Sequence, residues 1–391
     1  MVLIHGPRHC GKTTLAQAIG GEQGRSYLSF DDASTRAAAT TDPTGFIERL
    51  PSKVTLDEVQ RVPELFTSIK LVVDRDRAPG RFLLTGSANV LTLPRLSDSL
   101  AGRMSIQRLH PLSQAELNGV EPRFIDHLLE GRFALDERPR LGRELAERVV
   151  RGGYPAALIR HDPARAREWY LDYVETIIQR DVRERARITS RATLPRLLQL
   201  AASQTARLLN VSALASSFQL SRPTIQNHLV LLERIFQLDR LEPWHRSRLQ
   251  RLVHTPKLHI GDTGIATALL GLDANLLESD RDSLGHLLES FVYRELIRQA
   301  SGRPDRIRFY HYREKDDYEV DIVLESGDRV AGLEVKAGAS VRSEDFRGLR
   351  RLATHCEGRL TAGVVLYDGE RVLGFGDRLF AVPLRSIWET K

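Results

Sequence analysis

Eight residues near the amino end have the types and the spacing that phosphate binding requires. Residues 6–13 read GPRHCGKT, so a lysine and a threonine come directly after the second glycine. Backbone N–H groups of such a loop surround phosphates, the lysine adds a point charge, and the threonine hydroxyl ligates Mg²⁺. We therefore expect a nucleotide-binding loop, with Lys12 also acting in catalysis, made of Gly6, Pro7, Arg8, His9, Cys10, Gly11, Lys12, Thr13 and Thr14.

A pair of carboxylates further along the chain fits the same site. Residues 53–57 form an apolar segment that ends in Asp57, and Glu58 follows it. At the end of a buried strand, Asp57 could complete the Mg²⁺ shell together with Thr13, and Glu58 could activate the attacking water. A solvated acidic strand end is the ordinary alternative, but the complete loop upstream favours a catalytic pair.

Two further polar features could contact a phosphate. The apolar segment 82–84 runs into Thr85, Gly86 and Ser87, so Thr85 or Ser87 could sense a γ-phosphate, or the segment could simply end in a turn. Arg103 is a candidate arginine finger or sensor, because phosphoryl transfer requires a positive charge supplied in cis or in trans.

The elements that must position these residues alternate between strands and helices. Residues 1–118 have the pattern of a parallel sheet covered by helices, which is an α/β fold of the P-loop NTPase kind. The charged, proline-containing stretch 119–145 predicts a linker or irregular insertion, 146–255 is helical, and 256–391 mixes strands and helices. The expected strands of the first segment are 2–5, 27–30, 53–57 and 81–85.

Four segments carry a resemblance to a known family. GPRHCGKTTLA, SFDD, TLDEVQRVPELF and LLTGSANV together resemble the AAA-type ATPase domain of a large family of uncharacterised prokaryotic ATP-binding proteins. In that family a carboxy-terminal domain of formerly unknown function, nuclease-like in fold, follows the ATPase. The resemblance covers nearly the whole chain and implies ATP and Mg²⁺ as cofactors. Members of the family have a longer segment before the first strand, so adenine contacts are expected to be missing or the start to lie further upstream.

The helical region contains a helix-turn-helix spacing. One helix is expected to begin with residues 210–215. A second is expected to begin with residues 222–233 and to have Ser221 as its N-cap. After the second helix, residues 235–241 and 246–248 are expected to form a wing, as the family resemblance also implies. In a DNA-binding winged helix, the side chains expected to face the groove are Arg222, Thr224, Gln226 and Asn227. The alternative is a winged helix used only for packing or subunit contact.

The last segment resembles the core of the PD-(D/E)XK nuclease superfamily, also called restriction-endonuclease-like. The positions that match its metal-binding motif are Glu289, Asp321 and Glu334, with Lys336 beside them. Carboxylates in such a core hold Mg²⁺ ions that polarise a phosphodiester, and the lysine orients or deprotonates water. The alternative is a salt bridge between Glu334 and Lys336 on one face of a strand, without metal.

Composition narrows the class of protein. The chain has no apolar run long enough to span a bilayer and no export signal, so we expect a cytoplasmic protein without membrane contact. Two cysteines and no HExxH motif argue against disulfides or a structural metal. A net charge of +6 favours polyanionic partners. Only seven of the 57 basic residues are lysines, and Lys12 and Lys336 are the two within motifs.

Together these patterns predict a Mg²⁺-dependent ATPase coupled to a nucleic-acid-binding, nuclease-like domain. DNA is the expected partner, and a homo-oligomer or a partner protein remains open. The first alternative is a metal-dependent DNA endonuclease in which ATP is only a switch. The second is a regulatory ATP-binding adaptor that catalyses nothing.

Overall fold

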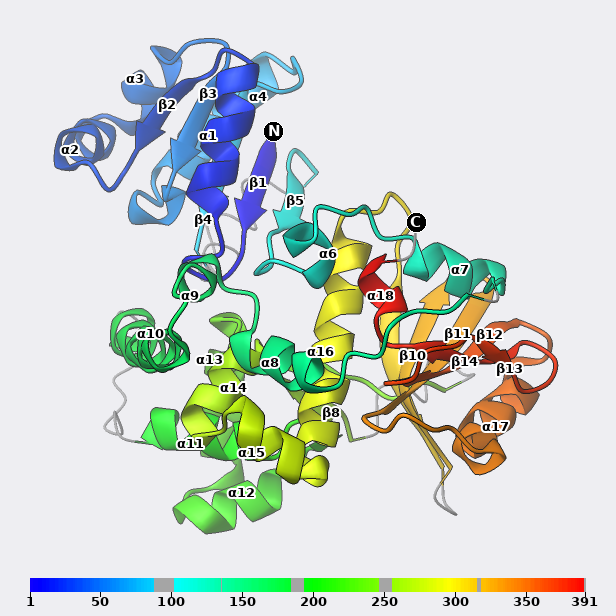
Figure 1. The fold of residues 1–391 in the computed structure, drawn as a ribbon. Coiled ribbons are helices and arrows are strands. Elements are labelled where there is room, and N and C mark those ends of the chain that lie inside the picture. Colours follow the sequence, from blue (N-terminus) through cyan, green and yellow to red (C-terminus); the bar gives the residue numbers. More distant parts are fainter. Residues whose placement is uncertain (88–101, 135, 184–192, 246–254, 315–317, 390–391) are drawn as a thin grey trace. The chain divides into compact units, whose positions relative to one another are not determined.

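The computed structural model divides the chain into two compact units. The described residues are 1–87, 102–134, 136–183, 193–245, 255–314 and 318–389, with side chains left out for 180–183 (Figure 1). The first unit is residues 1–111 with 234–236, and the second is 112–233 with 237–391. The first boundary that the sequence predicted, at residue 118, stays a prediction.

The first unit is built on a parallel sheet with the order β2-β3-β4-β1-β5. All four expected strands are present, with a fifth beside β1. The strands are β1 (Val2–His5), β2 (Ser26–Ser29), β3 (Val54–Asp57), β4 (Phe82–Gly86) and β5 (Ser105–Arg108). Since the strands are parallel, the segments that follow β1, β3 and β4 leave the sheet at one edge, where the predicted phosphate-binding residues lie.

Helices cover this sheet and close its core. Leu65, Phe66, Ile69 and Val72 form one apolar stripe of α4, and all four are buried against the strands. The core cluster includes residues from β1, β3 and β4, so packing fixes the three strands whose ends carry the site. The helices are α1 (Lys12–Glu22), α2 (Ala33–Thr41), α3 (Pro43–Glu48) and α4 (Leu65–Arg75), with a 3₁₀ turn at Val59–Arg61.

The second unit begins with a run of short and long helices. These helices are α6 (Gln114–Leu117), α7 (Phe124–Glu130), α8 (Arg143–Arg151), α9 (Pro155–Leu158), α10 (Pro163–Arg183) and α11 (Thr193–Ser203). The stretch expected to be a linker contains α7, whose residues Phe124, Ile125, Leu128 and Leu129 are buried. Its Leu128 carbonyl accepts a hydrogen bond from Thr361 on β12 (Leu360–Tyr367), so α7 is an integral part of this unit.

A small antiparallel sheet follows α11 and has the order β6-β8-β7. Two helices separate its first strand from the other two. The elements are β6 (Arg207–Leu208), α12 (Val211–Phe218), α13 (Arg222–Arg234), β7 (Leu238–Leu241) and β8 (Lys257–Ile260). Residues 246–248, which belong to the expected wing, lie outside the described residues.

The carboxy-terminal part contains a six-stranded mixed sheet with the order β13-β14-β12-β11-β10-β9. The strands β9, β10 and β11 are antiparallel neighbours, and β11, β12 and β14 are parallel. Two helices precede the long α16, and α17 joins β11 to β12. Besides β12, the elements are α14 (Thr263–Leu270), α15 (Ala274–Ser279), α16 (Arg281–Ser301), β9 (Arg308–Arg313), β10 (Glu319–Ser326), β11 (Arg329–Lys336), a 3₁₀ turn (Ser343–Phe346), α17 (Arg347–Cys356), β13 (Leu373–Gly374), β14 (Leu379–Pro383) and α18 (Ser386–Glu389).

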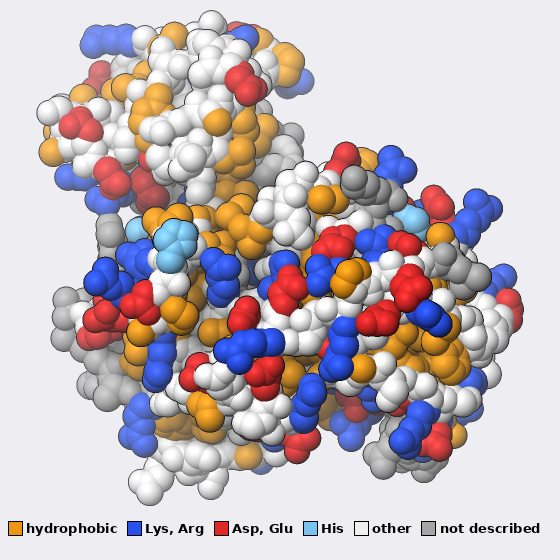
Figure 2. Space-filling model, viewed as in Figure 1, with side chains coloured by type: hydrophobic (Ala, Val, Ile, Leu, Met, Phe, Trp, Pro, Cys, Tyr) orange, Lys and Arg blue, Asp and Glu red, His pale blue; other side chains and the backbone are white. Residues whose placement is uncertain are grey.

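The surface of the second unit carries charges of both signs. In the face that Figure 2 presents, basic and acidic side chains are interspersed rather than gathered into one basic patch. None of the helices in the described ranges is both long and apolar enough to cross a lipid bilayer.

Candidate nucleotide site and carboxylate cluster

The glycine-bounded loop joins β1 to α1 and depends on both of its glycines. Gly6 has a φ of +157°, and a Cβ there would lie 2.1 Å from the backbone oxygen of Leu109. Gly11 has a φ of +100° and directly precedes the first turn of α1. Any other residue would be strained at Gly11 and would clash at Gly6. The loop backbone therefore turns tightly into the N-terminus of a helix, which favours bound anions.

Lys12 lies inside this loop. Only 6% of the residue is exposed, and its ammonium donates hydrogen bonds to the carbonyl oxygens of Gly6 (3.2 Å) and Pro7 (2.7 Å). The loop thus holds the lysine through backbone acceptors. A phosphate bound in the loop would offer the same ammonium charged oxygens, which are stronger acceptors than carbonyls.

Asp57 is the polar centre of the first unit. Its residue is 3% exposed, and its carboxylate accepts hydrogen bonds from four hydroxyl groups. Thr13 donates from 3.1 Å, Tyr27 from 2.9 Å and Ser29 from 3.5 Å, and Thr85 also donates. The structure therefore brings Thr13 and Asp57 together as the sequence predicted. It adds two donors from β2 that the sequence analysis missed.

The strand order explains this convergence. β3 lies between β2 and β4, with Ser29 paired to Asp57 and Leu56 paired to Leu84. Residues 27 and 29 of β2 are two apart and so share one face. Burial, followed by the hydrogen bond to Asp57, raises the pKa of Tyr27 to about 12, so its phenol stays a protonated donor at neutral pH.

The Asp57 site provides the ligands that a magnesium ion prefers. A threonine hydroxyl and a carboxylate meet at hydrogen-bond distance, next to a loop that can hold phosphates. Mg²⁺ binds oxygen atoms and usually keeps waters and phosphate oxygens as further ligands. The chemistry of Thr13 and Asp57 therefore fits an ATP-bound Mg²⁺ ion.

Glu58 has an unusual backbone conformation. Its φ is +59°, in the left-handed region that costs a residue with a side chain about 1–3 kcal/mol. The backbone N–H of Glu58 donates to the Thr85 hydroxyl at 3.1 Å, which helps hold this conformation. Its carboxylate accepts a hydrogen bond from Gln60 and lies 3.9 Å from the guanidinium of Arg8. Strain of this kind is often found at functional sites.

Thr85 links the two acidic residues. Its buried hydroxyl donates to Asp57 and accepts from the backbone of Glu58. Ser87 is also buried and accepts a hydrogen bond from Gln60 at 3.0 Å. A direct γ-phosphate contact by either hydroxyl stays a prediction, whereas the link from Thr85 to both carboxylate residues is a property of the structure.

Arg103 lies at the opposite end of the strands from the loop. It comes just before β5, whose first residue Ser105 pairs with Val2 at the start of β1. Its guanidinium forms two hydrogen bonds to Asp74, at 2.5 and 3.1 Å. Within one chain Arg103 thus lies away from the phosphate loop, which leaves the far end of β1, and its predicted role as an arginine finger or sensor, in cis or in trans, stays a prediction.

The predicted nuclease-like carboxylates surround a lysine that the sequence analysis did not assign. The ammonium of Lys257, on β8, lies 2.9 Å from Glu289, 3.1 Å from Asp321 and 2.7 Å from Glu319. Burial lowers the lysine pKa, but the three carboxylates outweigh this effect and hold the pKa well above its usual value. In the described part of the chain, no group of three or more His, Cys, Asp or Glu residues is arranged to hold a metal ion.

Glu334 joins this cluster, and Lys336 lies at its periphery. Burial and then the neighbouring Asp321 raise the pKa of Glu334 well above its usual range. Burial also acts to raise the pKa of Asp321, but the ammonium of Lys257 and the backbone N–H of Val335 lower it overall. The ammonium of Lys336 instead lies 3.6 Å from Asp345, with 42% of the side chain exposed. Lys257, rather than the predicted Lys336, is the lysine within the cluster.

The side chains expected to read DNA lie at the start of α13. Arg222, Gln226 and Asn227 are exposed, and Thr224 is half-buried. The hydroxyl of Ser221 accepts a hydrogen bond from the Thr224 backbone at 3.3 Å, as the predicted N-cap requires.

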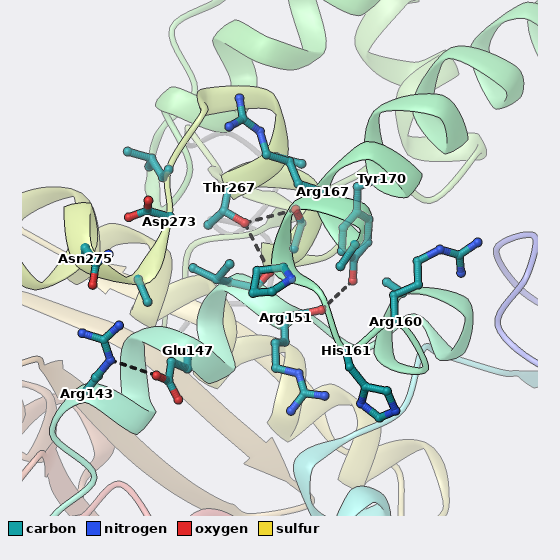
Figure 3. Close-up of a pocket in the computed structure, with 18 residues that line it drawn as sticks. Arg143, Glu147, Arg151, Arg160, His161, Arg167, Tyr170, Thr267, Asp273 and Asn275 are labelled. Atoms are coloured by element: carbon teal, nitrogen blue, oxygen red, sulfur yellow. Dashed lines mark hydrogen bonds and ion pairs between the residues drawn. The ribbon is translucent and has the colours of Figure 1, made fainter.

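A cavity of about 520 Å³ lies elsewhere in the second unit (Figure 3). Its walls combine apolar residues of α8, α10 and α14 with arginines at their edges. Arg143 is paired with Glu147 and Glu278, and Tyr170 donates to the carbonyl of Arg151. None of the site residues that the sequence predicted lines this cavity.

Three parts of the chain match known families. Residues 1–118 match the family described as AAA domain, 142–276 match the domain of unknown function DUF8612, and 284–387 match the domain of unknown function DUF4143. The chain thus has an AAA domain, which suggests nucleotide binding and hydrolysis, followed by regions without an assigned function.

Three uncharacterized relatives are similar to this chain over most of its length. The chain is 29% identical over 392 residues to the uncharacterized proteins Rv2008c of Mycobacterium tuberculosis and Mb2031c of Mycobacterium bovis, covering 100% of this chain and 81% of theirs. It is 22% identical over 335 residues to the uncharacterized protein MJ1544 of Methanocaldococcus jannaschii, covering 82% of this chain and 71% of the relative.

Solved structures give a looser match. The Walker-type ATPase PABY2304 of Pyrococcus abyssi is 16% identical with a TM-score of 0.39, covering 69% of this chain and 90% of that one. The RuvB Holliday junction branch migration motor of Thermotoga maritima is 20% identical with a TM-score of 0.23, covering 61% and 81%. At such TM-scores neither structure supports an argument about the mechanism of this chain.

The link through Thr85 predicts a local loss of stability in a Thr85→Val variant. Valine keeps the shape but leaves the N–H of Glu58 without its acceptor and the buried carboxylate of Asp57 without one donor. Leaving a hydrogen-bonding group unpaired in this way lowers the free energy of unfolding by about 1–3 kcal/mol. Hydrogen–deuterium exchange should therefore show faster opening of β3 and β4. The control is Thr40→Val in α2, where an exposed hydroxyl bonds only to its own helix. Equal exchange in the two variants would contradict the link.

Proposed function

We propose that the first unit binds ATP with Mg²⁺ and hydrolyses it, and that its nucleotide state is coupled to nucleic-acid contact by the second unit. The observation that supports this most strongly is the meeting of Thr13 and Asp57 beside the loop that holds Lys12. The match of residues 1–118 to the AAA domain family supports the same proposal.

In this proposal each side chain has a separate task. The loop N–H groups and Lys12 hold the β- and γ-phosphates, and Thr13 and Asp57 hold the Mg²⁺ ion that neutralises charge on them. Glu58 orients and deprotonates the attacking water, since it follows Asp57 directly at the end of β3. Gln60 and Arg8 contact that carboxylate and so restrict its direction.

Two rival functions use the same nucleotide site differently. In the first, ATP binds only as a switch for an endonuclease in the second unit. In the second, ATP binding regulates an adaptor that recruits other proteins. Neither rival requires Glu58 to activate water, so ATP turnover separates them from the proposal.

A Glu58→Gln variant should retain ATP binding and lose turnover. Glutamine keeps the shape of the side chain but cannot accept the proton, and loss of a general base lowers kcat by about 100-fold or more. Turnover can be measured by phosphate release from the full chain and ATP affinity by calorimetry. Glu22→Gln, at the exposed end of α1, is the matched control and should behave as wild type. Wild-type turnover in Glu58→Gln would refute the assignment of the base.

A second proposed activity is DNA contact by α13. The order of α11, β6, α12, α13, β7 and β8, with a three-stranded antiparallel sheet, is the order of a winged helix. α13 buries Ile225, Leu229 and Leu232 while Arg222 and Gln226 remain exposed, as a recognition helix requires. The net charge of +6 is consistent with a polyanionic partner.

An Arg222→Ala variant should bind duplex DNA several-fold more weakly. If Arg222 contacts a phosphate, the slope of log affinity against log salt concentration should also fall by about one. Fluorescence anisotropy at several salt concentrations measures both quantities. Arg165→Ala on α10 is the control, because this arginine is highly exposed and lies on another helix. An unchanged affinity and salt slope in Arg222→Ala would argue against recognition by α13.

A further inference from the structure

Lys257 is the most deeply buried charged group among the nuclease-like carboxylates. Only 2% of its side chain is exposed, and it reaches the cluster from β8, whereas Glu289 belongs to α16 and Asp321 to β10. An ammonium has three N–H donors. Three carboxylates lie at 2.7, 2.9 and 3.1 Å, so each donor has an acceptor.

The three carboxylate oxygens lie at hydrogen-bond distances from the Lys257 nitrogen, so the ammonium already occupies the space between them. Both oxygens of Asp321 are also engaged, one by Lys257 and the other by the backbone N–H of Val335 at 3.0 Å. A divalent ion placed among these carboxylates would be repelled by the ammonium beside it.

A second cation, Arg313, reaches the edge of the cluster: its guanidinium lies 3.6 Å from Glu319, and 42% of its side chain is exposed. His259 lies behind Glu289, with its Nε2 at 3.9 Å from Oε1, and its Nδ1 is 2.9 Å from the hydroxyl of Ser290. Lys336, the lysine that the nuclease motif would place at the site, is directed to Asp345.

We propose that Lys257 is a built-in cation that takes the position of the divalent metal in a nuclease-like core, so that the cluster joins β8 to α16 and β10 without metal. In this assignment the second unit does not cleave phosphodiesters through Asp321. Its carboxylates instead fasten the winged-helix-like sheet to the nuclease-like sheet. The proposal concerns a different site from the ATPase and does not depend on it.

Manganese binding by the full chain tests this assignment. An Asp57→Asn background removes the expected metal site of the first unit, and electron paramagnetic resonance then counts bound Mn²⁺. We expect no Mn²⁺ site in this background. Adding Lys257→Met removes the cation but keeps a long apolar side chain. It should create one Mn²⁺ site that binds at least tenfold more tightly than any residual Mn²⁺ association with the background protein. Adding Lys336→Met instead is the matched control and should create none.

Thermal unfolding in the same background gives a second readout. Lys257→Met removes the ammonium that contacts three carboxylates, so it should unfold at a lower temperature, and Mn²⁺ should restore part of the loss. Lys336→Met should show neither effect.

Three results would overturn the assignment. One is Mn²⁺ binding with Lys257 in place that disappears on adding Asp321→Asn. Another is DNA cleavage by the wild-type chain that Asp321→Asn abolishes. The third is a folded Lys257→Met variant that gains no Mn²⁺ site. If Lys257→Met does not fold, the Mn²⁺ count with Lys257 in place decides alone: no bound Mn²⁺ supports the assignment.

Discussion

The buried carboxylate of Asp57 at the end of β3 is the group on which the nucleotide site depends. It receives hydroxyl hydrogen bonds from α1, β2 and β4, and a buried carboxylate is stable only when such donors surround it. Thr85 extends the arrangement to Glu58, whose left-handed backbone it helps to hold. The loop, the proposed metal ligands and the proposed base are therefore connected through one side chain, and the sheet order β2-β3-β4-β1 makes the connection possible.

The two units stabilise their buried acidic groups in different ways. Around Asp57 the partners are neutral hydroxyl groups, which a metal ion can replace or join as ligands. Around Asp321 the partner is the ammonium of Lys257, a full charge fixed by the backbone of β8. The first arrangement leaves a negative centre for Mg²⁺, and the second supplies its own cation. This difference in charge, rather than the number of carboxylates, separates an expected catalytic site from a structural one.

Much of the first unit could be predicted from sequence because its determinants are local. The order of strand, loop and helix around Lys12, and the apolar segment before Asp57, specify both elements and their residues. Tyr27 and Ser29 could not be found in this way, because their contact with Asp57 depends on which strand lies beside β3. The position of Arg103 could not be found for a similar reason: it follows from the pairing of β5 with β1. One sequence feature could have drawn attention to Lys257: it is a lysine in the apolar segment KLHI of an arginine-rich chain. Its carboxylate partners could not be identified, because they are distant in sequence.

The most direct test of the account is the effect of Mg²⁺ on ATP affinity in wild type and in Asp57→Asn. If the carboxylate of Asp57 organises the metal site, Mg²⁺ should raise ATP affinity in the wild-type chain by about tenfold or more. A tenfold gain corresponds to about 1.4 kcal/mol of binding free energy. In Asp57→Asn the affinity without Mg²⁺ should be nearly unchanged, and the gain from Mg²⁺ should largely disappear. An equal gain from Mg²⁺ in both proteins would contradict the central role of Asp57.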